Sequence, residues 1–481
     1  MTDNKLFELI NSLTAAERQE CAVFLQSPYH NRREDVWKLW EWSQNHFGEK
    51  GRRTAERNRN VREQSGAPFG GPEALASIYP GQPYDDARWR HLQSYLTACI
   101  EAFLAQRAFE QTPLLGDLHL AAVYRQKGLR KPLEHTLRRA AERLEKMPRD
   151  QHYYRHLYEL EWERYAATQS QARTRENNLA EVDRAFDVYL VAGKLRLACL
   201  MESHRAVFPV EYDNTLLSAL LAALDASDLK KEPVVALCFH CYKALTEGNE
   251  ADFRAFRQEL EEQGGALPVD EVRTFLLLAI NYCIRRLNTG EPHYVREAFD
   301  LYRIGLETRA LLENGHLGRF AFKNIVALGL KLEEFAWVES FIGRFEPFLE
   351  EKYRAAHRNY NLARLYFARK DYRQAMPLLA RVDESDLLLN LDSRVMLLKM
   401  YYETEEWDAL DALLSSFRVL LLRKKKVIGY HSANYLATLR FVQKLARLNF
   451  EDKKAVASFR VETEAKKGLL EKEWLLKMVA R

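Results

Sequence analysis

The feature that most constrains this chain is a short turn that occurs three times between apolar helical segments. Each turn ends in an acidic residue followed by an aromatic one, namely Glu334-Phe335, Asp371-Tyr372 and Glu406-Trp407. The pairs are 37 and 35 residues apart, which is the period of a repeat built from two helices. We therefore expect Asn324–Leu414 to fold as a stack of helical hairpins.

The composition of the whole chain is consistent with this architecture. Only 20 glycines and 14 prolines occur in 481 residues, whereas an all-β fold needs frequent turn residues. Hydrophobic residues make up 47% of the chain, which is ample for a core. We predict an all-α protein: a right-handed superhelical stack of antiparallel helix hairpins, or α-solenoid, with a small helical unit at the N-terminus.

Breaks in the helical pattern divide the chain into five predicted segments. Thr14-Ala15-Ala16-Glu17 has the form of a capping box and marks a helix start in the first segment. Residues 48–72 hold five glycines and five arginines with few apolar residues, which is typical of a flexible linker. The segments are an N-terminal helical unit (1–47), a flexible basic linker (48–72), an irregular helical repeat region (73–312), the clearest hairpin repeats (313–422) and a basic C-terminal helical cap (423–481).

The N-terminal unit is rich in tryptophan. Trp37, Trp40 and Trp42 lie close together in one predicted helix. They either pack this unit onto the repeats as a cap or form an exposed aromatic surface for docking into a larger assembly.

One hairpin carries the residues of a known repeat. Asn361-Leu362-Ala363, Tyr366, Asp371-Tyr372, Ala375 and Leu379 resemble a tetratricopeptide repeat, in which small residues such as Ala363 and Ala375 let the two helices pack closely. The flanking hairpins depart from that pattern, with Gly329 in place of the aromatic residue and Leu410 in place of the small one. The whole chain also resembles uncharacterised bacterial helical-repeat proteins that share the N-terminal unit.

The resemblance implies a function and a binding surface. Tetratricopeptide arrays are usually scaffolds that bind a protein or peptide in the groove lined by the first helix of each hairpin. Such a groove would be polar and net basic, which suits an acidic partner; the alternative is an ordinary solvated helix face. The partner-binding residues implied for this chain are Lys323, Asn324, Arg358, Asn361, Arg364, Lys399 and Tyr402.

Positive charge is concentrated at the C-terminal end. Residues 415–481 hold sixteen Lys and Arg against six Asp and Glu, although the whole chain has a formal net charge of only +4. This asymmetry indicates either a basic cap of the stack or a site for an anionic partner, nucleic acid included. The candidate anion-binding residues are Arg423, Lys424, Lys425, Lys426, Arg440, Lys444 and Arg447.

No motif in the sequence indicates catalysis. Cys238-Phe239-His240-Cys241 has the spacing of two zinc ligands, but no second pair lies nearby, so we interpret it as a buried apolar helical turn. We expect no enzyme activity, no cofactor and no metal. The six cysteines are expected to be reduced core thiols, and no run of apolar residues is long enough to span a membrane, so we expect a cytoplasmic protein.

Binding is therefore the predicted function. The first hypothesis is a non-enzymatic helical-repeat scaffold that binds a protein or peptide partner through its concave groove. The alternatives are a nucleic-acid-associated factor that uses the basic C-terminal region, and a structural subunit of a larger complex.

Overall fold

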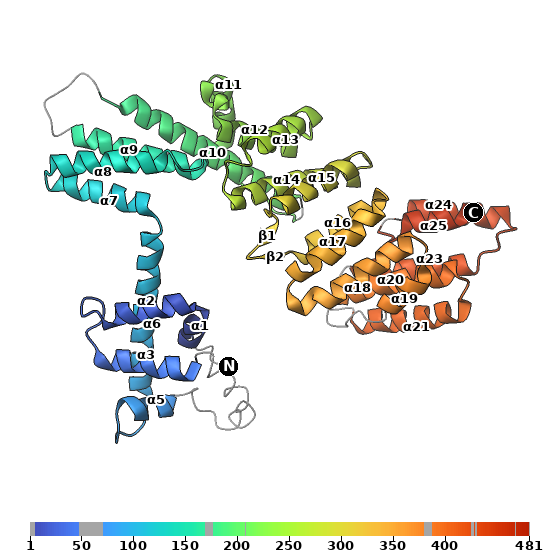
Figure 1. The fold of residues 1–481 in the computed structure, drawn as a ribbon. Helices are drawn as coiled ribbons and strands as arrows, with labels where there is room; N and C mark the ends of the chain where they lie inside the picture. Colours follow the sequence, from blue (N-terminus) through green and yellow to red (C-terminus); the bar gives the residue numbers. More distant parts are fainter. Residues whose placement is uncertain are drawn as a thin grey trace. The chain divides into compact units, whose positions relative to one another are not determined.

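The computed structural model describes residues 5–47, 71–168, 177–206, 208–379, 387–424, 428, 431–466 and 468–480. Across these ranges the chain is almost entirely α-helical (Figure 1). Regular strands are limited there to one antiparallel pair, β1 (Leu312–Glu313) and β2 (His316–Leu317). The prediction of an all-α protein is confirmed. Residues 48–70 of the predicted linker lie outside the described residues, as do Lys425 and Lys426.

The described residues form two compact units. The first takes in the chain up to Met147 together with Tyr153–Phe186. The second takes in Pro148–His152 and the chain from Asp187 onward. The helices of the first unit are α1 (Lys5–Ser12), α2 (Ala15–Gln26), α3 (Glu34–Phe47), α5 (Gly71–Ile78), α6 (Asp86–Glu110), α7 (Pro113–Gln126), α8 (Arg130–Leu144), most of α9 (Gln151–Thr168) and the start of α10 (Leu179–Arg205).

The N-terminal helices share one core with the long helix α6. Helices α1, α2 and α3 all contact α6, and α5 contacts both α3 and α6. Trp40 and Trp42 are buried in this core and Trp37 packs against it. The tryptophans thus pack within the first unit, and the exposed aromatic docking surface considered from the sequence is absent from the described residues. The predicted capping box is confirmed, because Thr14 and Glu17 each accept a hydrogen bond from the other's backbone amide.

The second unit is built mainly from helical hairpins. Helix α12 packs on α13, α14 on α15, α16 on α17, α18 on α19 and α20 on α21. Its elements after α10 are α11 (Leu217–Asp225), α12 (Pro233–Glu247), α13 (Glu250–Gln263), α14 (Val269–Asn288), α15 (Tyr294–Glu307), the two strands, α16 (Arg319–Lys331), α17 (Phe335–Phe345), α18 (Glu351–Ala368), α19 (Tyr372–Leu379), α20 (Leu387–Glu403), α21 (Trp407–Arg423), α23 (His431–Ala446), α24 (Lys453–Ala465) and α25 (Lys472–Val479), with short 3₁₀ turns at Asp228–Lys231 and Glu346–Phe348.

Neighbouring hairpins contact one another through their first helices. Helix α12 contacts α14, α16 contacts α18 and α18 contacts α20. The second helix of a hairpin also contacts the first helix of the next, as α17 does with α18 and α19 with α20. Helix α18 is therefore enclosed by neighbours on several sides, and this enclosure decides which of its polar residues reach solvent.

The three turns identified in the sequence share one backbone conformation. In each, the residue before the acidic one adopts a left-handed conformation: φ is 59° at Glu333, 60° at Lys370 and 61° at Glu405. The following amide donates to the carbonyl five residues earlier, from Glu334 to Gly329 at 2.9 Å, from Asp371 to Tyr366 at 2.8 Å and from Glu406 to Tyr401 at 2.9 Å. This hydrogen bond satisfies a carbonyl at the end of the first helix. The repeated turn in the sequence is therefore a repeated helix-terminating turn.

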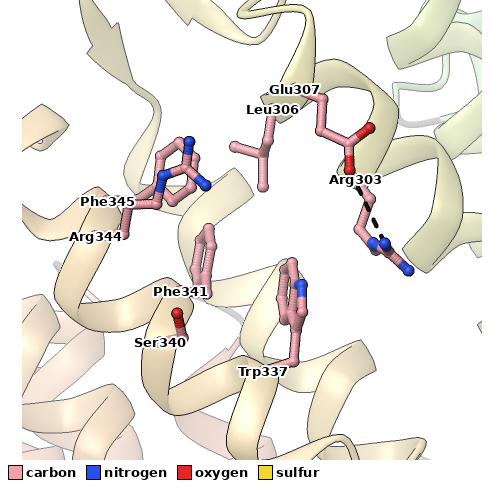
Figure 2. A pocket seen from close by; sticks show the side chains of 8 residues that line it. All are labelled: Arg303, Leu306, Glu307, Trp337, Ser340, Phe341, Arg344 and Phe345. Atoms are coloured by element: carbon pink, nitrogen blue, oxygen red, sulfur yellow. Dashed lines mark ion pairs between the residues drawn. The ribbon is translucent and has the colours of Figure 1, made fainter.

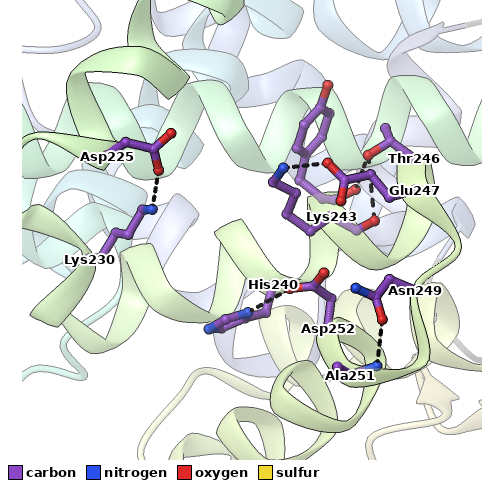
Figure 3. Close-up of polar contacts among 10 residues, drawn as sticks. Asp225, Lys230, His240, Lys243, Thr246, Glu247, Asn249, Ala251 and Asp252 are labelled. Atoms are coloured by element: carbon purple, nitrogen blue, oxygen red, sulfur yellow. Dashed lines mark hydrogen bonds and ion pairs between the residues drawn. The ribbon is translucent and has the colours of Figure 1, made fainter.

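The hairpin of α12 and α13 shows how such turns are fixed by polar side chains (Figure 3). Gly248 ends α12 with a φ of 65°, and its amide donates to the carbonyl of Ala244. Asn249 caps α13 by accepting a hydrogen bond from the amide of Ala251 at 2.9 Å. His240 on α12 contacts Asp252 on α13 at 3.3 Å, so the ring ties the two helices together.

Gly329 is explained by the close packing of α16 on α17. A Cβ atom added to Gly329 would lie 2.5 Å from Cγ2 of Val338 and 3.2 Å from Cε2 of Phe299. In this hairpin the large side chain at the contact, Val338, belongs to the second helix. In the tetratricopeptide pattern the large side chain is an aromatic residue on the first helix, at the position of Gly329. In the next hairpin, Ala363 and Ala375 are both fully buried in one core, consistent with their expected place between the helices.

Candidate partner-binding site

Two cations predicted to line the groove are held inside the second unit. Lys323 on α16 forms an ion pair with Asp392 on α20. Arg364 on α18 donates to the main-chain carbonyl of Lys323 at 3.2 Å. Both cations lie over the ring of Tyr360, at 5.6 Å for Lys323 and 5.8 Å for Arg364. The structure therefore brings these residues together, but they hold adjacent hairpins to one another.

Lys399 is also used internally. Its ammonium pairs with Glu471 at 2.7 Å, and only 12% of its side chain is exposed. It lies 4.8 Å from the ring centre of Phe367 and 5.8 Å from that of Trp474 on α25. The C-terminal helix thus covers a residue that the sequence placed in an open groove.

The remaining residues of the predicted groove differ in their exposure. Arg358 is exposed and pairs with Glu346 at 2.9 Å, and Asn324 is exposed. Tyr402 is half-buried, with its ring 5.6 Å from Trp407 and 5.5 Å from Trp474.

Asn361 requires a correction. Its side chain is 0% exposed, and its amide donates to the carbonyl of His357 at 2.8 Å, one turn earlier on the same helix. The prediction that Asn361 faces an open groove is therefore wrong. The reason is that α16, α17, α19 and α20 all contact α18, whereas the sequence pattern distinguishes only one apolar face from one polar face.

Three of the seven candidate anion-binding residues line one groove. Arg440 and Lys444 on α23, with Arg447 directly after the helix, line one open groove of about 670 Å³ between α23 and α24. The opposite wall carries Ala455, Ser458, Phe459 and Glu462. Lys444 pairs with Glu462 at 2.7 Å, whereas Arg440 and Arg447 are exposed and form no ion pair with any described residue. We call this site the α23–α24 groove.

The other predicted anion-binding residues lie elsewhere. Arg423 and Lys424 are exposed at the C-terminal end of α21 and do not line the α23–α24 groove. Lys425 and Lys426 lie outside the described residues. The seven cations therefore do not form one continuous site within the described chain.

A further hollow, which was not predicted from the sequence, lies between α15 and α17 (Figure 2). It has a volume of about 80 Å³, which is enough for a few atoms of one side chain. Trp337 and Phe341 stack at 5.3 Å on one wall and point towards Leu306, while the guanidinium of Arg344 lies over Phe345 at 5.3 Å. Aromatic residues and an arginine at helical spacing on α17 are the signal that the sequence offered for this hollow.

The cysteines lie in the cores of the two units. All six are buried and free, as predicted. Burial raises the pKa of the Cys283 thiol to about 12, and burial and then Cys99 raise the pKa of Cys21 to about 12. Cys238 and Cys241 are buried in α12, as predicted for an apolar turn, and the sulfur of Cys199 contacts the carbonyl of Cys238 at 3.6 Å. The thiols of Cys21 and Cys283 are therefore protonated near neutral pH, which makes them poor nucleophiles and poor metal ligands.

The described residues contain neither a metal-binding cluster nor a membrane-spanning helix. Within the described ranges, no group of three or more His, Cys, Asp or Glu residues is placed to hold a metal ion. Among the described helices, none combines the length and apolar character needed to cross a membrane. The features that remain as candidate sites are hollows lined by cations and aromatic rings.

Comparisons with known proteins give no relative to which a site could be matched. The chain matches no family model, no curated protein and no solved structure.

Proposed function

We propose that this protein is a non-enzymatic, tetratricopeptide-like scaffold that binds an acidic protein segment, and that the segment docks in the α23–α24 groove. The proposed architecture is a right-handed α-solenoid, supported by the contacts of α16 with α18 and of α18 with α20. A cytoplasmic location is part of the proposal, supported by six buried free thiols that suit a reducing compartment.

The observation that carries the proposal is the convergence of three cations on one groove. Arg440 and Arg447 are free to bind a carboxylate, because neither has an ion-pair partner among the described residues. Arginine binds a carboxylate through two parallel hydrogen bonds, which gives both affinity and orientation. Leu448 and Ala455, both half-buried, supply apolar surface in the same groove. Acidic side chains alternating with apolar ones would match this arrangement.

The first-helix face is the weaker candidate on electrostatic grounds. Lys323, Arg358 and Lys399 each have a carboxylate partner within the second unit. A partner would have to displace these carboxylates or bind a surface whose charge is already neutralised. The docking site proposed here is therefore the α23–α24 groove instead of the groove implied by the family resemblance.

An acidic protein segment is a better partner than nucleic acid because the groove has few unpaired cations. Lys444 is already paired with Glu462, so the groove offers two unpaired arginines. Proteins that bind nucleic acid tightly neutralise about 6–10 phosphates, and their affinity falls steeply with salt. Two unpaired arginines are too few to neutralise that many phosphates. The groove also has apolar lining residues, with which phosphates would make no favourable contact.

A direct binding experiment with the full chain tests the proposal. The probe is a short fluorescein-labelled peptide of alternating glutamate and leucine, and binding is followed by fluorescence anisotropy. Charge reversal at Arg440 and Arg447 together is expected to weaken binding by about tenfold or more, since each lost carboxylate contact contributes on the order of 1 kcal/mol. Reversal of Arg373 and Arg418, which are exposed on α19 and α21 outside the groove, is the matched control and is expected to change affinity less than about twofold.

Two results would contradict the proposal. Equal losses from the groove pair and the control pair would mean that the peptide responds to general charge. A labelled oligouridylate that binds more tightly than the peptide, and that is displaced by moderate salt, would assign the groove to nucleic acid. Reversal of Lys323, Arg358 and Arg364 in parallel tests the first-helix face in the same assay.

A further inference from the structure

The first unit contains an open hollow that is lined by an acidic residue and aromatic rings, whereas the α23–α24 groove is lined by cations. It lies between α9 and α10, has a volume of about 490 Å³, and is lined by Tyr158, Leu179, Ala180, Val182, Asp183 and Phe186. All of these residues belong to the first unit. We call it the α9–α10 hollow.

Aromatic rings form one wall of the α9–α10 hollow. The rings of Tyr158 and Phe186 are 5.1 Å apart at an interplanar angle of 48°, and Trp162 continues the row at 6.4 Å from Tyr158. Phe186 is 40% exposed and Trp162 is 47% exposed. Large rings with this exposure on adjacent helices present π faces that attract cations.

Asp183 is the carboxylate available in the α9–α10 hollow. It is exposed and forms no ion pair with any described residue. The carboxylates of α9 are engaged by local partners: Glu159 with Arg155 at 3.1 Å, Glu161 with Arg164 at 2.6 Å and Glu163 with Arg125 at 2.9 Å. The negative charge that lines the hollow therefore comes from Asp183.

We propose that the α9–α10 hollow is a docking site for an arginine-bearing segment of a partner protein. The guanidinium would stack on Phe186 and Tyr158 while it donates hydrogen bonds to Asp183. The aliphatic part of the arginine side chain would cover Leu179, Ala180 and Val182. Arginine fits better than lysine because its planar group can stack on a ring and bond to a carboxylate at the same time.

This site is independent of the α23–α24 groove. One takes a cationic segment through an acid and aromatic rings, and the other takes an acidic segment through arginines. The protein would then recognise two kinds of partner segment at two places. No residue is shared between the two sites. A negative result for one proposed binding site therefore leaves the proposal for the other site unaffected.

The test uses the full chain and two matched peptides. The first is a short fluorescein-labelled peptide of alternating arginine and leucine. The second has citrulline at each arginine position, which keeps the planar shape and removes the charge. Wild-type protein is expected to bind the arginine peptide about tenfold more tightly than the citrulline peptide, the factor expected when a cation–π contact and an ion pair are both lost.

Variants separate the two contributions. Asp183→Asn removes the charge and Phe186→Leu removes the ring while keeping an apolar side chain. Each is expected to weaken binding of the arginine peptide several-fold, and neither is expected to change binding of the citrulline peptide. Asp411→Asn, at an exposed position on α21 with no ion-pair partner among the described residues, is the control and should leave binding unchanged.

Three outcomes would overturn the inference. The first is equal binding of the two peptides, and the second is a loss with Asp411→Asn as large as that with Asp183→Asn. The third is self-association of the chain that Asp183→Asn abolishes, which would identify the occupant as a second copy. Both altered side chains are exposed, so unchanged circular dichroism and melting temperature are expected for the variants.

Discussion

Lys323 on α16 and Tyr435 on α23 meet at a single carboxylate, that of Asp392 on α20. Lys323 forms an ion pair with one oxygen, and the hydroxyl of Tyr435 donates to the other at 2.8 Å. Burial and then the charge of Asp392 raise the pKa of Tyr435, so its phenol remains a hydrogen-bond donor over a wide pH range. One acidic side chain therefore joins three helices that are distant in the sequence.

Replacing Asp392 should destabilise the second unit. Asp392→Ala leaves the half-buried Lys323 without its ion-pair partner and the Tyr435 hydroxyl without its acceptor, which should cost about 1–3 kcal/mol of unfolding free energy. The measurement is the midpoint of urea denaturation followed by circular dichroism. Asp411→Ala, at an exposed position on α21, is the control and should change stability by less than about 0.5 kcal/mol. Equal midpoints for the two variants would contradict a structural role for the Asp392 cluster.

The left-handed turns predict that glycine is tolerated better than alanine at the residue before the acid. Glu405 has a φ of 61°, a conformation in which a Cβ atom is strained and glycine is not. Glu405→Gly should be more stable than Glu405→Ala by about 0.5–1 kcal/mol, because both variants lack the carboxylate and only alanine retains the strain. Thermal denaturation of both variants is the comparison. Indistinguishable melting temperatures would show that the turn is not strained at this residue.

Adding a side chain at Gly329 should destabilise the protein. Gly329→Ala places a methyl group against Val338 and Phe299 and should destabilise the protein by about 1–3 kcal/mol. Gly343 on the neighbouring helix α17 has no atom within 4 Å of an added Cβ, so Gly343→Ala should be neutral or stabilising by up to about 1 kcal/mol. A further variant, Gly329→Ala with Val338→Ala, should recover part of the loss, because the second change makes room for the first.

The buried thiols predict a dependence of stability on alkaline pH. The pKa of Cys283 is about 12 in the folded chain, above the ordinary value of 9.0. Between those values the folded state binds more protons than the unfolded state, so stability is full below pH 9 and falls as the pH rises towards 12. Cys283→Ala should make this fall shallower, as measured by urea midpoints at about pH 8 and about pH 10.5. Parallel pH profiles for the variant and the wild type would show that this thiol does not contribute.

The same burial predicts slow thiol modification. All six cysteines are buried, so a thiol-specific disulfide reagent should react slowly with the native protein near pH 8 and rapidly with all six thiols in urea. Fast reaction of any thiol in the native state would identify a cysteine that is reached by local opening.

The sequence alone located the helices and the turns well, because both depend on local chemistry. The capping box at Thr14 and Glu17, for example, is formed by residues within one turn. The acid–aromatic turns were also visible, although only the structure shows the left-handed residue before each acid. Burial of the cysteines followed from their apolar neighbours in helical runs.

Tertiary structure alone decided what the charged residues do. The carboxylate partners of Lys323 and Lys399 lie 69 and 72 residues further along the chain, and no local pattern indicates such a pairing. Asn361 is buried because four other helices enclose α18, and this number of neighbours depends on how the hairpins pack. Arg440, Lys444 and Arg447 could be placed on one face from their spacing, but the groove exists only because α24 supplies its second wall. Helix periodicity specifies which face of a helix is polar, and only packing determines whether that face meets solvent, a carboxylate or another helix.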